Sequence, residues 1–194
     1  MSLQRLTCTN DAQGATLTHV CDPCGRELGR VRGVILFDGS FDIQGLIDAI
    51  KANDATAETL IETAVTSGQA HLISETTGTY DGGSPQTGDG YGDAENRLLG
   101  YLYTLNFKDP SYAPNKEFWE KAEYNQFYIA FRTESLLHFA DKPATLQAIA
   151  PVEQDLTSAV VWNVTGTWKS KNKPEIVPLE PVKKFFDGCW EVAE

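Results

Sequence analysis

The clearest pattern along the chain is an alternation of apolar and polar residues between positions 99 and 108. The apolar set is Leu99, Tyr101, Tyr103, Leu105 and Phe107, and the residues between them are mostly small or polar. Because successive side chains of a β-strand point to opposite faces, this period of two predicts a strand with one apolar face. Asp109 and Pro110 follow and predict the end of the strand, since proline has no N–H for a strand ladder.

Several other segments are rich in the residues that favour strands. Segments 30–37, 70–80, 127–139, 145–150 and 160–169 are enriched in β-branched and aromatic side chains, and the last of them also alternates. These compositions suit the pleated, half-buried surface of a sheet. Strands are therefore expected to make up most of the ordered chain.

Helical patterns are few and short. Apolar residues between positions 43 and 50 recur at the spacing of one helix face, and Asp42 stands where its side chain can cap the first turn. A weaker pattern spans 55–66, and Asn115 is predicted to cap another short helix. We therefore predict a mainly β protein with one or two short flanking α-helices.

The sequence divides into three parts. Residues 1–29 mix Cys, Thr, Asn and Gly without periodicity and predict a cysteine-containing N-terminal arm. Residues 30–170 hold the predicted strands of one β-rich domain. Residues 171–194 begin with a proline-rich stretch and predict an extended C-terminal arm, the alternative being that both ends pack on their own domain. The glycine-rich span 81–93 is predicted to be a long mobile loop that orders on assembly.

Composition and charge narrow the function classes. A length of 194 residues fits one domain, and a net charge of −11 argues against binding nucleic acid through its phosphates. The same charge would let DNA pass along the protein without sticking. No apolar run is long enough to cross a bilayer and the first residues lack a secretory signal, so we expect no membrane association and no export.

The cysteines are the one constellation that indicates a metal. Cys21 and Cys24 form a Cys-x-x-Cys-Gly sequence, the half-knuckle that can wrap a tetrahedral zinc ion. Cys8 could supply a third thiolate and Cys189 a fourth, which would require the two ends of the chain to meet. Free thiols or an adventitious disulfide are the alternatives. No cofactor is expected to be required, and a structural zinc ion is the only one that the cysteines suggest.

Catalytic patterns are missing from the sequence. The histidines are scattered, and neither a Gly-x-Ser-x-Gly elbow nor a His-Glu-x-x-His motif occurs. Acids around the glycine-rich span, from Asp81 to Glu95, could bind calcium, but their spacing differs from that of an EF-hand. We therefore expect a protein that is not an enzyme and has no catalytic residues.

The order of elements in the second half of the chain resembles the tail-tube proteins of long-tailed bacteriophages. The predicted order is strand (97–108), short helix (115–124), strand (127–139) and strands (146–168). The likeness is greatest in 144–168, where a strand, an acidic turn and a long alternating strand follow one another. The chain also looks similar to proteins of Bacteroidetes phages and prophages. The resemblance covers about half of the chain, and the cysteine segment and residues 52–66 depart from it.

The resemblance implies a tail-tube-like fold, a β-sandwich or half-barrel, whose sheets join between subunits into a ring that is commonly hexameric. It implies a virion protein of a tail tube or connector, assembled in the bacterial host cytoplasm. Its partners would be further copies, other virion proteins and DNA passing through an acidic lumen without specific binding. The alternative is a small ligand- or carbohydrate-binding β-sandwich that stacks sugars on Tyr101, Trp119, Trp162 and Trp168.

Overall fold

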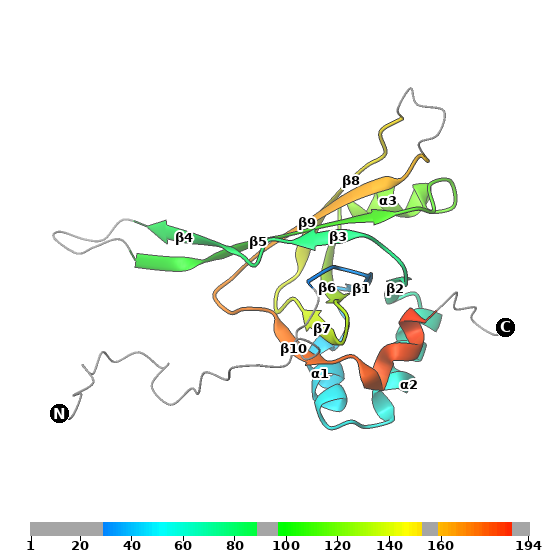
Figure 1. Ribbon diagram of the computed structural model, residues 1–194, viewed down its shortest axis with the longest axis vertical. Coiled ribbons are helices and arrows are strands. Elements are labelled where there is room, and N and C mark those ends of the chain that lie inside the picture. The colour runs from blue at the N-terminus through cyan, green and yellow to red at the C-terminus, as the bar shows by residue number, and fades with distance from the viewer. Residues whose placement is uncertain (1–28, 89–96, 153–158, 188–194) are drawn as a thin grey trace.

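A computed structural model of the chain describes residues 29–88, 97–152 and 159–187 (Figure 1). The strands are β1 (Gly33–Asp38), β2 (Ala70–Ile73), β3 (Gly78–Tyr80), β4 (Ser84–Gly88), β5 (Arg97–Asp109), β6 (Gln126–Arg132), β7 (Leu136–Phe139), β8 (Ala144–Ile149), β9 (Trp162–Ser170) and β10 (Glu175–Pro178). The helices are α1 (Ile43–Lys51), α2 (Thr56–Thr66), α3 (Lys116–Ala122) and the 3₁₀ helix η2 (Glu180–Phe186). The prediction of a mainly β protein is confirmed.

The described strands form one open antiparallel sheet that bends back over itself. Its main path runs β10-β7-β6-β8-β9-β5-β3, while β1 pairs with β6 and β2, and β4 pairs with β5. Figure 1 shows the half that contains β8, β9, β5 and β3 lying above the half that contains β6, β1 and β2. The two halves face each other like the sheets of a sandwich.

The alternating strand predicted from residue 99 onward is β5, which lies between β9 and β3 in the sheet. Tyr103, Leu105 and Phe107 of β5 are buried in the first of two hydrophobic cores, where they pack against residues of β9, β1 and β6. The other face of β5 carries Thr104 and Asn106 and is accessible to solvent. The period of two therefore separates core from surface from Tyr103 onward as predicted, whereas Leu99 of the same predicted face is 49% exposed.

A second core lies between the lower half of the sheet and the helices. α1 buries Leu46, Ile47 and Ile50, while α2 buries Ala57, Ile61 and Ala64. The Asp42 carboxylate accepts a hydrogen bond from the Gly45 amide at 3.1 Å, so the predicted cap of α1 is confirmed. Figure 1 places α1 and α2 together beneath the sheet.

The prediction of an extended C-terminal arm over 171–194 needs correction for its described part. β10 pairs with β7, and η2 buries Val182, Phe185 and Phe186 in the second core. The prolines do not oppose this, because one ends β10 and another occupies the first turn of η2. This end of the chain is part of the domain as far as residue 187.

The prediction of a long loop over 81–93 also needs correction. Ser84–Gly88 form β4, which pairs with β5, whereas residues 89–93 lie outside the described residues. The Asp81 carboxylate accepts hydrogen bonds from the amides of Gly83 and Thr104, so it shapes the turn into β4. Asp81 therefore has a structural role in this turn.

Two predicted strands are each split because the chain changes partners. Segment 70–80 becomes β2, which pairs with β1, and β3, which pairs with β5 in the other half of the sheet. Segment 127–139 becomes β6 and β7, an antiparallel pair joined by a short turn. Composition alone marked both segments as extended, but the turns between them depend on contacts distant in sequence.

A buried carboxylate connects the end of β5 to α3. Asp109 is 2% exposed and accepts hydrogen bonds from the Ser111 amide, Asn115 Nδ2 and Trp119 Nε1 at 2.9, 2.7 and 2.8 Å. The prediction that the Asn115 side chain caps the helix is therefore wrong, because that side chain binds Asp109 and makes no cap hydrogen bond. Three donors compensate the buried charge of Asp109.

Replacing Gly83 by alanine is expected to destabilise the protein by about 2–3 kcal/mol, because it combines backbone strain with a steric overlap. Gly83 has φ +92°, and a Cβ there would overlap the Tyr103 ring, whose hydroxyl is held by the Asn172 carbonyl at 2.9 Å. Gly82→Ala is the matched control, since Gly82 has φ +75° but an added Cβ meets no atom within 4 Å. Urea denaturation should show a loss of only about 1 kcal/mol for the control. Equal losses would contradict the overlap.

Candidate assembly surfaces

A two-stranded ribbon projects from one end of the sheet. β9 ends at Ser170, opposite Tyr101, so Arg97–Gly100 of β5 pair only with β4 among the described strands. Gly100, with φ +154°, stands where β5 stops pairing with β9. The register between β4 and β5 shifts next to the partner of Gly100, between Gln86 and Thr87. Figure 1 shows β4 and β5 extending away from the layered body.

The ribbon carries apolar side chains that nothing in the described structure covers. Leu98 is 52% exposed and Leu99 is 49% exposed. A single exposed leucine is ordinary on a protein surface, but adjacent leucines on a ribbon with an unpaired edge are not. An unpaired strand edge offers backbone N–H and C=O groups to another chain.

A second apolar site lies where the chain leaves β8. Ile149, at the end of β8, is 62% exposed and Val152 is 76% exposed. Ile149 pairs with Asn163 of β9, so its backbone position is fixed while its side chain faces solvent. The end of β8 therefore holds an uncovered apolar side chain at a fixed place in the fold.

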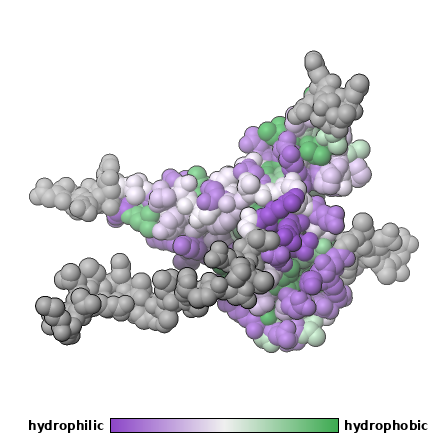
Figure 2. Space-filling model, viewed as in Figure 1, coloured by the Kyte–Doolittle hydropathy of each residue, from purple (hydrophilic) through white to green (hydrophobic). Residues whose placement is uncertain are grey.

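These two apolar sites lie at opposite ends of the same sheet. Ile149 of β8 pairs with Asn163 of β9, which in turn pairs with Lys108 of β5. Leu99 lies nine residues before Lys108 along β5. At about 3.3 Å per residue, this separation is on the order of 30 Å. Figure 2 shows hydrophobic residues in green on the ribbon and again near the far end of the molecule. One chain therefore cannot cover one site with the other.

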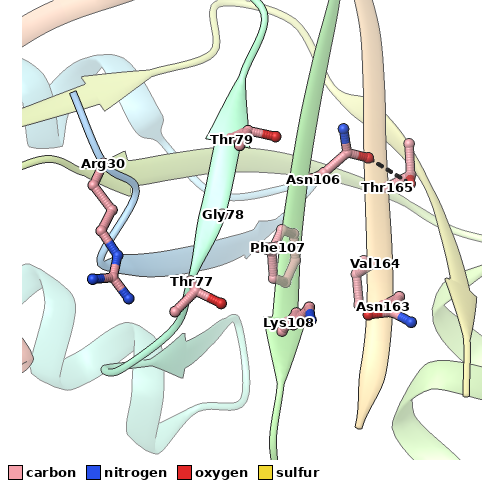
Figure 3. A pocket seen from close by; sticks show the side chains of 10 residues that line it. All are labelled: Arg30, Thr77, Gly78, Thr79, Asn106, Phe107, Lys108, Asn163, Val164 and Thr165. Atoms are coloured by element: carbon pink, nitrogen blue, oxygen red, sulfur yellow. Dashed lines mark hydrogen bonds between the residues drawn. The ribbon is translucent and has the colours of Figure 1, made fainter.

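The solvent-facing side of β3, β5 and β9 is polar and shallow. A hollow of about 310 Å³ is bordered by Thr79, Asn106 and Thr165, with Arg30 and Lys108 at its rim (Figure 3). Thr165 donates a hydrogen bond to the Asn106 side-chain oxygen at 2.8 Å across the strands. This face therefore presents short polar side chains next to the two charged ones.

The aromatic residues proposed to stack sugars do not form a surface. Trp119, Trp162 and Trp168 are buried in the first core, and Tyr101 packs against that core. The Trp162 Nε1 donates to the Tyr112 carbonyl at 2.9 Å, which fixes the ring in place. The ligand-binding alternative therefore loses the tryptophans on which it was based.

A hollow of about 620 Å³ lies between β2 and α3 and contains a half-buried histidine. The His71 ring packs on Phe118 with ring centroids 4.5 Å apart. Burial lowers the pKa of His71 from its ordinary value of 6.5, and the nearby Asp38 carboxylate opposes this shift. The folded protein therefore favours the neutral imidazole.

We expect the free energy of unfolding to decrease as the pH falls below about 6.5, because the unfolded histidine then binds a proton that folded His71 resists. This contribution is complete above the pKa of the unfolded chain and is lost as the pH falls toward the lower pKa of the folded state. Denaturation of His71→Phe at several pH values isolates the effect, since the other titrating groups are unchanged. Identical pH slopes for the two proteins would contradict it.

The four cysteines of the zinc hypothesis lie outside the described residues. The described ends of the chain are nevertheless neighbours: a Cβ on Gly33 would overlap the Phe186 ring, and Arg132 Nη2 donates to the Phe186 carbonyl at 3.3 Å. The contact thus joins described residues that lie nine positions from Cys24 and three from Cys189 in the sequence.

We expect protein purified without chelator to contain about one zinc ion per chain, because four thiolates complete a tetrahedral site. Elemental analysis measures this directly. Zinc well below one per chain would rule out the site, and Cys24→Ser should remove the metal while leaving the β-core folded, since the core buries its own apolar strands.

Within the described part of the chain, no group of three or more His, Cys, Asp or Glu side chains could hold a metal ion. Of the acids considered for calcium, Asp81 serves the turn described above, and Asp89, Asp93 and Glu95 lie outside the described residues. No helix of the described residues is both long enough and apolar enough to span a membrane.

Comparisons with protein-family models, with curated proteins and with solved structures find no match for the chain. The resemblance to tail-tube proteins therefore remains a prediction from the sequence.

Proposed function

We propose that the protein is a structural component of a phage particle that assembles with copies of itself into the rings of a tail tube or connector. The observation that carries this proposal is the pair of uncovered apolar sites at opposite ends of one sheet, Leu98–Leu99 and Ile149–Val152. Sites at opposite ends favour head-to-tail contacts, which close into rings or extend into helical assemblies.

The unpaired edge of the ribbon supports the same proposal. A strand edge with adjacent leucines is an aggregation hazard in a monomer, and a closed ring removes such edges. Leu98–Gly100 lack a described strand partner on the side where β9 runs. Association would cover both the backbone groups and the leucines.

The charge distribution suits the passage of DNA through such a ring. Residues 1–28, 89–96, 153–158 and 188–194 hold ten of the 27 acidic residues but only two of the 16 basic ones. An acidic lumen would repel the phosphate backbone and keep DNA from binding to the wall. This function needs no catalytic group, and the protein would act in the virion after assembly in the host cytoplasm.

Sedimentation velocity tests self-assembly on the full chain over about 1–100 μM, the range in which transient subunit contacts reveal themselves. We expect the sedimentation coefficient to rise with concentration toward one closed species or a series of stacked ones. A single species of 21.3 kDa at every concentration would overturn the proposal.

A further inference from the structure

A hollow of about 590 Å³ lies at the base of the ribbon, where β9 ends and β5 continues with β4 alone. Leu99 and Tyr101 of β5 are among the residues that line it, together with Lys142, Lys169 and Lys171. We call these five residues the lysine notch. The pairing of β8 with β9 joins Lys142, which precedes β8, to the lysines near the end of β9.

The lysines of the notch have no ion-pair partner among the described residues. Five other described lysines do have such partners, for example Lys184, whose Nζ lies 2.7 Å from Glu58 and 2.8 Å from Glu62, while Lys108 and Lys173 have none in that part of the chain. Three unpaired lysines around one hollow are unexpected in a chain of net charge −11.

One carboxylate, that of Asp141, also borders the hollow, and its buried Oδ1 accepts no hydrogen bond within the described structure. Its Oδ2 accepts hydrogen bonds from the Ser170 hydroxyl and from Asn172 Nδ2 at 3.4 Å. The side chains that line the notch therefore keep an excess of positive charge. An occupant should combine carboxylates with an apolar part that can cover Leu99.

We propose that the lysine notch binds the segment of a second copy that begins at Ile149 and runs past Val152. This inference rests on the self-assembly proposed above and names the contact that produces it. Ile149 and Val152 are exposed and apolar, and Glu153 and Asp155 follow directly in the sequence. The segment thus has the apolar and acidic character that the notch requires.

Geometry excludes the same chain as the occupant. The notch and Ile149 lie at opposite ends of the β5–β9 pair, on the order of 30 Å apart. Every contact between notch and segment must therefore join two molecules. Because the two surfaces differ, the contact is head-to-tail and can repeat around a ring.

Charge reversal tests the contact in the full chain. Lys142→Glu combined with Lys169→Glu and Lys171→Glu should weaken association by about tenfold or more in sedimentation velocity, since like charges would then face each other. The control is Lys116→Glu with Lys121→Glu and Lys183→Glu, which changes the net charge equally at lysines outside the notch. Adding Glu153→Lys and Asp155→Lys to the notch variant should restore association.

A photo-crosslinking residue introduced at Val152 provides a readout that does not depend on the charge variants. It should crosslink to peptides containing Leu99, Tyr101 or the notch lysines of another molecule, whereas the same residue at Tyr124, which is 88% exposed, should not. If the protein assembles but neither the crosslink nor the charge effect is seen, this inference is wrong and the proposed function stands. If the protein does not assemble at all, both are wrong.

Discussion

Trp119→Ala is expected to lower the free energy of unfolding by about 3–5 kcal/mol, the range for removing a large aromatic side chain from a packed core. Trp119 is 1% exposed and lies in the first core, with its ring centroid 6.1 Å from that of Phe107. The substitution also removes the indole N–H that donates to the buried Asp109 carboxylate at 2.8 Å. Both losses act in the same direction.

Trp119→Phe separates the two contributions. It keeps most of the ring but removes the donor to Asp109, so we expect a loss of about 1.5–3 kcal/mol for a hydrogen bond to a charged group. Tyr124→Ala is the control, because Tyr124 is 88% exposed and should change stability by less than about 0.5 kcal/mol. Urea denaturation of all three variants measures the differences. A loss below 1 kcal/mol for Trp119→Ala would show that α3 does not depend on this anchor.

Ile149→Ser combined with Val152→Ser is expected to weaken self-association by about a hundredfold. Covering two aliphatic side chains contributes about 1.5 kcal/mol each at the lower end of the usual range, and every 1.4 kcal/mol is a factor of ten. The monomer should be nearly as stable as before, because the two side chains are 62% and 76% exposed.

Tyr124→Ser is the control for this experiment, since it also replaces a large side chain by serine but at an even more exposed position. Sedimentation velocity should show normal assembly for the control and mostly monomer for the double variant. Equal assembly of the two variants would show that the end of β8 is not an assembly surface, even if the protein forms rings by other contacts.

The sequence predicted those strands and helices that are determined by residues close together in the chain. The alternation from residue 99 predicted β5 and the side that it buries, and Asp42 predicted the start of α1. In both cases the residues that define the element also decide its burial or its cap. Such patterns need no knowledge of distant contacts.

The elements that were missed depend on contacts distant in sequence. β4 reads Ser-Pro-Gln-Thr-Gly, a composition typical of a loop, and it is a strand only because β5 offers a backbone partner. Asn115 occupies a cap position, yet its side chain turns to Asp109 because that buried carboxylate needs donors. The prolines after residue 171 suggested an arm, but Phe185 and Phe186 bring this segment onto the core.

The candidate assembly site was predictable only in part. Exposed strand edges and apolar strand faces led to the prediction of self-association. Of the long strand face only Leu99 is largely uncovered, and the other uncovered residues are Leu98, Ile149 and Val152. The lysine notch could not be foreseen, since Lys142 and Lys169 come together only through the pairing of β8 with β9. No periodicity in the sequence encodes that register.

Electron microscopy of the full chain in negative stain tests the central claim most directly, namely that this is a structural protein that closes head-to-tail into rings. At concentrations where sedimentation shows association, we expect closed rings of uniform diameter, separate or stacked into tubes, with the notch variant present mainly as single subunits. Monomers alone, or amorphous clusters without a repeating diameter, would contradict it.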